Sequence, residues 1–167
     1  MAEKNRKAKA GVPRTEVFAL RLDPKLKYLA EIAARKQRRS LANFVEWAIE
    51  EALKGVSLAE LDMNGYGPTV ASVATQLWAL DEPDRLRNLA THYPELLSYD
   101  EQLVWRVICE HSTYNSDTKR ISRFADEKMF DAALVRACWL EIKAFALEGG
   151  TLEKLDQAIR LHDDIPF

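Results

Sequence analysis

One short alternating segment near the N-terminus constrains the fold more than any other feature. It reads TEVFALRLDP and covers residues 15–24. Phe18, Leu20 and Leu22 share one face of an extended chain, and the residues between them share the other. A lone strand leaves its backbone N–H and C=O groups without partners, and the segments that follow have helical spacing. We therefore expect the partner strand to come from a second copy of the chain.

Two helices are expected after this strand. Asp23 offers an N-cap oxygen and Pro24 suits the first helical position, which predicts a helix over residues 24–37. Ser40 is the expected cap of a second helix, which ends at Gly55. Such a unit is too small to bury its own core, so we expect a symmetric dimer with four helices packed over one antiparallel ribbon. The expected dimer core comprises Phe18, Leu20, Leu22, Leu29, Phe44, Val45, Ala48 and Ile49.

The stretch TEVFALRLDPKLKYLAEIAARKQRRSLANFVEWAIEEAL resembles the ribbon-helix-helix DNA-binding domains of the Arc, MetJ and CopG repressor type. The resemblance covers about residues 14–54, and it depends on the order strand, helix, helix, on Asp-Pro after the strand and on the Arg-Ser-Leu-x-x-Phe entry to the second helix. It implies an intermolecular two-stranded ribbon in the DNA major groove, with Val17, Ala19 and Arg21 facing the bases. Arg21 can bridge guanine O6 and N7, or alternatively reach a phosphate or pair with Glu16. Family members have mostly polar residues at these positions, whereas Val17 and Ala19 offer only apolar contacts. DNA shape or arm contacts would then supply part of the specificity.

The charge distribution agrees with a nucleic-acid partner for the first third of the chain. Residues 1–55 contain 13 Lys and Arg against 7 Asp and Glu, whereas residues 56–167 contain 11 against 19. The resemblance also implies that the N-terminus of the second helix meets a phosphate. A solubilising tail at residues 1–14 and a plain solvated turn at residues 38–40 are the alternatives. The expected phosphate contacts are Lys4, Arg6, Lys7, Lys9, Arg14, Arg38, Arg39, Ser40 and Leu41.

The predicted organisation is a basic arm at residues 1–14, a ribbon-helix-helix domain at 15–55 and an acidic helical domain at 56–167. The last part keeps helical periodicity, with an expected loop at 113–122 and a long helix at 124–147. We therefore expect a mainly α protein whose C-terminal part is an all-α bundle with Trp78, Trp105 and Trp139 in its core. This bundle could extend the dimer, bind a protein or bind a small effector, and the sequence leaves these roles open.

No residue pattern points to an enzyme, a cofactor or a metal. The sequence has no glycine-rich phosphate loop. Cys109 and His111 are two residues apart, so a helix would direct them away from each other. Cys109 and Cys138 fall in apolar helical patterns and are expected to be buried, inert thiols of a cytoplasmic protein. No apolar run is long enough to cross a bilayer, and no secretory signal follows the basic N-terminus.

These features together predict a dimeric bacterial transcriptional regulator that binds double-stranded DNA, with higher assembly of dimers on DNA left open. One alternative is an accessory DNA-binding protein of plasmid transfer or partition. Another is an antitoxin whose main partner is a protein, although its long and globular C-terminal part argues against this. A last alternative is an interaction scaffold without a DNA role, and in all cases a protein partner could bind residues 56–167.

Overall fold

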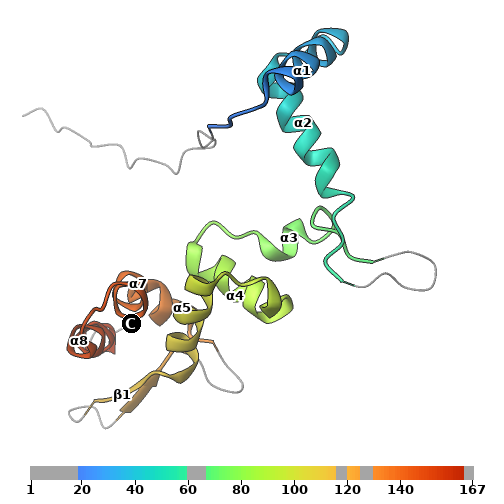
Figure 1. Cartoon of the computed structure of the whole chain (residues 1–167). Coiled ribbons are helices and arrows are strands. Elements are labelled where there is room, and N and C mark those ends of the chain that lie inside the picture. Colours follow the sequence, from blue (N-terminus) through green and yellow to red (C-terminus); the bar gives the residue numbers. More distant parts are fainter. Residues whose placement is uncertain (1–18, 60–66, 116–119, 125–129, 164–167) are drawn as a thin grey trace, which may run out of the picture. The chain divides into compact units, whose positions relative to one another are not determined.

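The computed structural model describes residues 19–59, 67–115, 120–124 and 130–163 (Figure 1). The chain divides into two compact units, Met1–Glu50 and Glu51–Phe167, which we call the basic unit and the acidic unit. In chain order the elements are α1 (Pro24–Lys36), α2 (Leu41–Leu53), α3 (Ala74–Leu77), α4 (Glu82–His92), the 3₁₀ turn η1 (Pro94–Leu96), α5 (Tyr99–Glu110), β1 (Ser112–Asn115), β2 (Arg120–Arg123), α6 (Ala132–Ala137), α7 (Trp139–Leu147) and α8 (Leu152–Asp163).

The helices of the basic unit begin at the side chains that were expected to cap them. The Asp23 carboxylate accepts a hydrogen bond from the backbone N–H of Lys25 at 2.9 Å, and Pro24 occupies the first turn of α1. The Ser40 hydroxyl accepts a hydrogen bond from the backbone N–H of Asn43 at 3.1 Å. Both caps satisfy amide groups that a helix cannot satisfy internally, so they define where α1 and α2 start.

The expected ribbon is the first correction to the sequence analysis. Residues 19–23 are not part of a strand, and residues 15–18 lie outside the described residues. A strand exists only when a second strand accepts and donates its backbone hydrogen bonds, and no described segment of the chain pairs with residues 19–23 as a strand. The prediction of a ribbon-helix-helix fold class is therefore wrong, whereas its helical part is compatible with α1 and α2.

The C-terminal part is the second correction, because it is not an all-α bundle. β1 and β2 pair antiparallel, with Ser112 opposite Arg123 and Asn115 opposite Arg120, where the sequence predicted a loop. Four-residue strands rich in polar residues show no apolar alternation, so the pattern gave no strand signal. The long helix predicted over residues 124–147 is instead divided into α6 and α7, which meet at Cys138.

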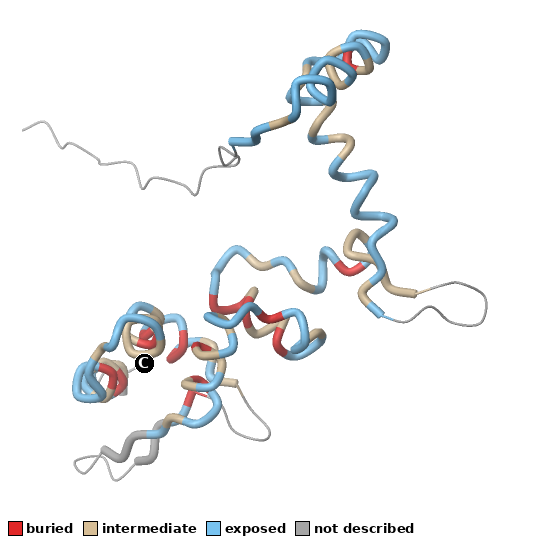
Figure 2. The backbone as a smooth tube through the Cα atoms, viewed as in Figure 1, coloured by how far each residue is buried: buried red, intermediate tan, exposed pale blue. Residues whose placement is uncertain are grey.

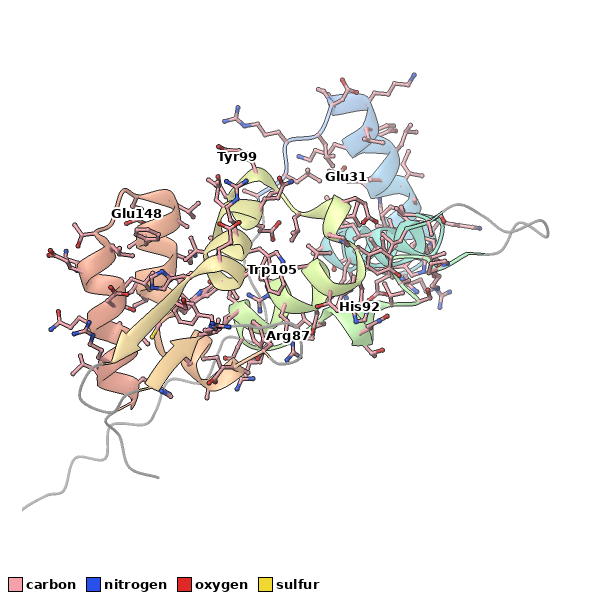
Figure 3. All side chains as sticks on the ribbon, turned by 90° about the horizontal axis from the view of Figure 1, so that it is seen from below. Glu31, Arg87, His92, Tyr99, Trp105 and Glu148 are labelled. Atoms are coloured by element: carbon pink, nitrogen blue, oxygen red, sulfur yellow. The ribbon has the colours of Figure 1, made fainter. Side chains whose placement is uncertain are left out.

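The hydrophobic core of the described residues lies in the acidic unit. Buried positions are concentrated in α4 to α8, whereas α1 and α2 are mostly exposed or half-buried (Figure 2). Arg87 and Trp105, labelled in Figure 3, both approach the ring of Phe130. The guanidinium carbon of Arg87 lies 5.3 Å from the centroid of this ring, and the ring centroids of Trp105 and Phe130 are 6.2 Å apart. The core cluster comprises Leu86, Ala90, Leu97, Val104, Ile108, Phe124, Leu134, Val135, Cys138, Ile142, Leu155 and Ile159.

An ion pair between a buried carboxylate and an exposed guanidinium joins two helices that are far apart in the sequence. Asp84 in α4 is buried, and its Oδ2 accepts a hydrogen bond from Nε of Arg136 in α6 at 3.0 Å. The Oδ1 atom of Asp84 has no hydrogen-bond partner among the described residues. Removing Arg136 would leave a buried carboxylate unpaired, which is a costly change in a protein interior. The pair therefore orients α6 on α4.

Two glycines end α7, and the structure predicts that they tolerate alanine differently. Gly149 has a φ of +71° and open space around it, so Gly149→Ala costs about 1 kcal/mol of unfolding free energy from left-handed strain alone. A β-carbon on Gly150 would stand 2.8 Å from the backbone carbonyl carbon of Ala144, which cannot move aside without distorting α7. Urea denaturation followed by circular dichroism should show the larger loss for Gly150→Ala. Equal losses would contradict this account of the α7 terminus.

Candidate nucleic-acid interface

The turn between α1 and α2 has a backbone conformation that is unusual for its residue. The backbone N–H of Arg38 donates to the carbonyl of Arg35 at 3.1 Å, and that of Arg39 donates to the carbonyl of Ala34 at 2.9 Å. This pair of bonds is the Schellman motif, which requires a left-handed residue just after the helix. Arg38 occupies that position with a φ of +56°. Glycine is usual there, because a β-carbon costs about 1–2 kcal/mol in this region.

The strained Arg38 is followed directly by a helix N-terminus with free donors. The backbone N–H groups of Leu41 and Ala42 belong to the first turn of α2, where no intrahelical carbonyl is available. The first turn of α2 contains no acidic residue. The positive end of the helix dipole is therefore not neutralised by the helix's own carboxylates, and both Arg38 and Ser40 are exposed beside it.

Arg39 is held in place by an aromatic side chain of the same unit. Its guanidinium carbon lies 5.2 Å from the centroid of the Trp47 ring, which is a cation–π distance. The Trp47 ring is in turn 5.6 Å from the ring of Phe44. The sequence contains no indication of this contact between Trp47 and Arg39, and the Trp47 side chain is half-buried. A tryptophan eight positions after a cation gives no spacing signal, because helical neighbours are three or four residues apart.

The remaining expected DNA contacts are only partly covered by the structure. Ala19 and Arg21 are exposed, as a contact with DNA requires. Residues 1–18 lie outside the described residues. This range includes the expected contact and core residues Lys4, Arg6, Lys7, Lys9, Arg14, Val17 and Phe18.

The basic unit lacks a hydrophobic core of its own among its described residues. Ala34 is the single buried residue of α1, and α2 has none. The expected dimer-core residues Leu20, Leu29 and Ile49 are 53%, 51% and 50% exposed. Four others are half-buried, namely Leu22, Phe44, Val45 and Ala48. This much exposed aliphatic surface on two short helices is typical of a surface that another molecule covers.

His111 and Cys109 do not form a common site. Nε2 of His111 lies 3.0 Å from Oδ1 of Asp156 in α8, so the imidazole joins the end of α5 to α8. Cys138 is buried as expected, whereas Cys109 is exposed. Partial desolvation nevertheless raises the pKa of the Cys109 thiol, and neighbouring Glu110 adds to the shift, so this thiol is less nucleophilic than a free one. Among the described residues, no group of three His, Cys, Asp or Glu side chains is placed to hold a metal ion.

Comparisons of the chain with protein-family models, with curated proteins and with solved structures found no match. None of the helices in the described ranges is both long enough and apolar enough to cross a bilayer. The functional interpretation of this chain therefore depends on its own residues, above all on the turn from Arg38 to Ser40 and the exposed apolar faces of α1 and α2.

Replacing Arg38 by glycine should stabilise the basic unit. Arg38→Gly removes the left-handed strain and should raise the opening free energy of the α1 and α2 amides by about 1 kcal/mol, as measured by hydrogen exchange. The matched control is Arg35→Gly, which places glycine inside the last turn of α1 and should lower the same free energy by about 1 kcal/mol. A loss of protection in Arg38→Gly would mean that the Arg38 backbone is not strained.

Proposed function

We propose that the protein is a homodimeric regulator of transcription that binds double-stranded DNA through residues 1–55. The observation that carries this proposal is the turn at residues 38–40. It combines two arginines, an exposed helix N-terminus and a first turn without carboxylates. Backbone N–H groups at a helix N-terminus together with guanidinium groups are a common way of holding DNA phosphates.

The strain at Arg38 adds weight to this assignment. A left-handed arginine costs free energy that glycine would avoid, so its side chain is expected to offset that cost in another way. A guanidinium beside the N-terminus of α2 can bind the same phosphate as the backbone N–H groups of that helix. Arg39, steadied over the Trp47 ring, supplies a second cation at the same place. The neighbouring cap residues Ser40 and Leu41 complete the proposed phosphate site.

A second copy of the chain is the proposed cover for the exposed apolar faces of α1 and α2. Identical copies present identical surfaces, so a two-fold arrangement lets Leu29 and Ile49 of each copy leave water together. Full burial of a leucine or isoleucine contributes about 1.5–3 kcal/mol, and several such residues are available in each copy. Dimerisation would also present two turns of the kind formed by residues 38–40, and hence two phosphate sites, to one DNA duplex.

Base recognition is proposed for the residues that precede α1. Arg21 is exposed and can donate two hydrogen bonds to one guanine. Ala19 and Val17 can contact only an apolar group such as the thymine methyl. The acidic unit, which contains 19 Asp and Glu against 11 Lys and Arg over residues 56–167, would be repelled by DNA. This repulsion would turn the basic residues toward the duplex.

The large acidic unit favours a regulator over an antitoxin. It has a core of its own that includes Ile108, Ile142 and Leu155, which are fully buried, whereas a toxin-binding tail would be short and would lack such a core.

A map of binding sites across the genome distinguishes a transcriptional regulator from an accessory protein of plasmid transfer. Sites at promoters support a regulator, whereas sites confined to a plasmid transfer origin would contradict that role while keeping the DNA contacts.

A charge introduced on the apolar face of α1 should prevent dimerisation. We expect the full chain to sediment as a dimer at micromolar concentration and Leu29→Glu to sediment as a monomer, because the carboxylate would have to be buried without a partner. The control is Leu140→Glu on α7, where the side chain is 75% exposed and the acidic unit should be unaffected. A monomeric wild-type chain, or a dimeric Leu29→Glu variant, would argue against the proposed interface.

DNA affinity should depend strongly on salt. If each dimer contacts six or more phosphates, the affinity for a fluorescently labelled duplex should fall by roughly 10³ or more between 50 and 200 mM salt. Arg38→Gly should weaken binding to all duplexes and reduce the slope of log affinity against log salt by about one for each phosphate that the variant no longer binds. Because this variant is expected to be more stable than the wild type, its weaker binding could not be attributed to unfolding.

Two further arginine variants distinguish phosphate contacts from base contacts. Their DNA binding is measured by fluorescence anisotropy with the same labelled duplex. Arg21→Ala should reduce discrimination between the preferred duplex and a random one by about five- to a hundredfold. Arg106→Ala on α5 removes an exposed arginine from the acidic unit and should change neither affinity nor discrimination. An unchanged titration in both Arg21→Ala and Arg38→Gly would remove the basis of the proposed function.

A further inference from the structure

The acidic unit contains an apolar cleft of about 670 Å³, a volume within the usual range for small-molecule sites. We call it the α4–α7 cleft, because α4, α5 and α7 form most of its walls, together with α3, the segments on either side of α3 and Leu53 at the end of α2. These elements can be followed in Figure 1 from green through yellow to orange. The apolar residues that matter for its chemistry are Val70, Leu77, Trp78, Leu86, Val104 and Trp139.

One wall of the cleft is held by side-chain bonds from α4. Nη1 of Arg85 donates hydrogen bonds to the carbonyls of Ala79 and Leu80 at 3.0 and 2.9 Å. The Arg85 guanidinium carbon also lies 5.0 Å from the centroid of the Trp78 ring. Trp78 is 68% exposed, yet these contacts place its ring beside α4 in a defined position. A large aromatic ring in water, held by its neighbours, is more typical of a binding surface than of a core.

A second part of the lining is fixed by a network centred on Glu82, which also belongs to α4. The indole N–H of Trp139 donates to Oε2 of Glu82 at 2.9 Å, and Nζ of Lys143 lies 3.0 Å from Oε1. Lys143 also lies 5.8 Å from the centroid of the Trp139 ring. The hydrogen bond from Trp139, supported by Lys143, holds the pKa of Glu82 below its usual value despite partial desolvation. The second tryptophan of the cleft therefore has a fixed position and a fully ionised neighbour.

The charges that line the cleft favour a cationic ligand. Three carboxylates and two cations contribute to the lining, namely Glu82, Asp100, Glu101, Arg85 and Lys143. Glu82 is paired with Lys143, and Glu101 accepts the backbone N–H of Ser98 in a capping box. Asp100 is exposed and has no hydrogen bond or ion pair with any described residue. The charged lining side chain that has no such partner among the described residues is therefore an acid, and the lining contains one more carboxylate than cations.

The two tryptophan rings add a second reason to expect a positive ligand. The electron-rich face of an indole attracts cations, and the protein itself places Arg85 over Trp78 and Lys143 over Trp139. An organic cation with apolar substituents could share these rings while its substituents contact Leu77, Leu86 and Val104. A small anion would meet the uncommitted Asp100 carboxylate, which repels it.

We propose that the α4–α7 cleft is a binding site for small organic cations with an apolar body. Hydrocarbon or aryl groups of the ligand fill the space between Trp78 and Trp139, and its positive charge faces Asp100. This proposal does not depend on DNA binding, because every group it uses belongs to the acidic unit. A concave site of this volume encloses a small molecule, whereas a basic protein segment would need an extended surface.

The test uses two probe ions of the same shape and opposite charge. Isothermal titration calorimetry of the full chain should show saturable one-to-one binding of tetraphenylphosphonium. Tetraphenylborate presents the same four phenyl groups around a negative centre and should bind at least about tenfold more weakly, because Asp100 and the indole faces repel it. Equal affinity of the two ions, tighter binding of the borate, or no binding of the phosphonium would overturn the proposal.

Two variants locate the bound cation. Asp100→Asn should weaken phosphonium binding about three- to tenfold, and Trp78→Ala should weaken it by a similar factor, because they remove the charge partner and the ring face. The matched control is Glu153→Gln, which neutralises an exposed carboxylate in the first turn of α8, as Asp100 lies in the first turn of α5. Unchanged affinity in both cleft variants would show that the cation binds elsewhere. Circular dichroism checks their folding, and the contrast between the two ions on the unaltered chain decides the proposal even if a variant fails to fold.

Discussion

The apolar faces of α1 and α2 have no cover within the described part of their own unit, and this constraint governs the basic part of the protein. A helix of 13 residues is marginal in water without tertiary packing, and α1 and α2 each have that length. Ala34 is the one buried residue of these two helices, so packing within the described part of the basic unit contributes little to their stability. The proposed dimer would couple association to the stability of α1 and α2, and both would then depend on protein concentration.

The acidic unit solves the same problem internally. Its helices enclose a core that reaches from Leu86 in α4 to Ile159 in α8, and the Asp84–Arg136 pair ties α6 to α4. A unit that is stable by itself can present a fixed cleft, because Trp78 and Trp139 are held by neighbours that do not depend on a partner. The two units thus differ in charge and in how far their apolar side chains are buried.

Most of the helices and part of the candidate interface could be predicted from the sequence. Asp23, Ser40 and the Ser98–Glu101 capping box act within three residues of themselves, so their spacing alone defines helix starts. The exposed Arg38 and Arg39 were also expected from their place before Ser40. The sequence could not establish the ribbon, because a strand forms only when a second strand pairs with it. The hairpin of β1 and β2 was missed because it is short and shows no apolar alternation.

The sequence by itself determined the helix caps, the apolar stripes of α1 and α2 and the contrast between a basic and an acidic part. Only the tertiary structure decided that Trp47 holds Arg39 and that Glu82 meets Trp139 across 57 positions of the chain. The physical reason is the separation of the interacting residues along the chain. Helix caps and apolar helix faces arise from residues a few positions apart, so the spacing of residue types in the sequence predicts them. A contact between distant residues depends on how whole helices pack, and no spacing rule contains that information.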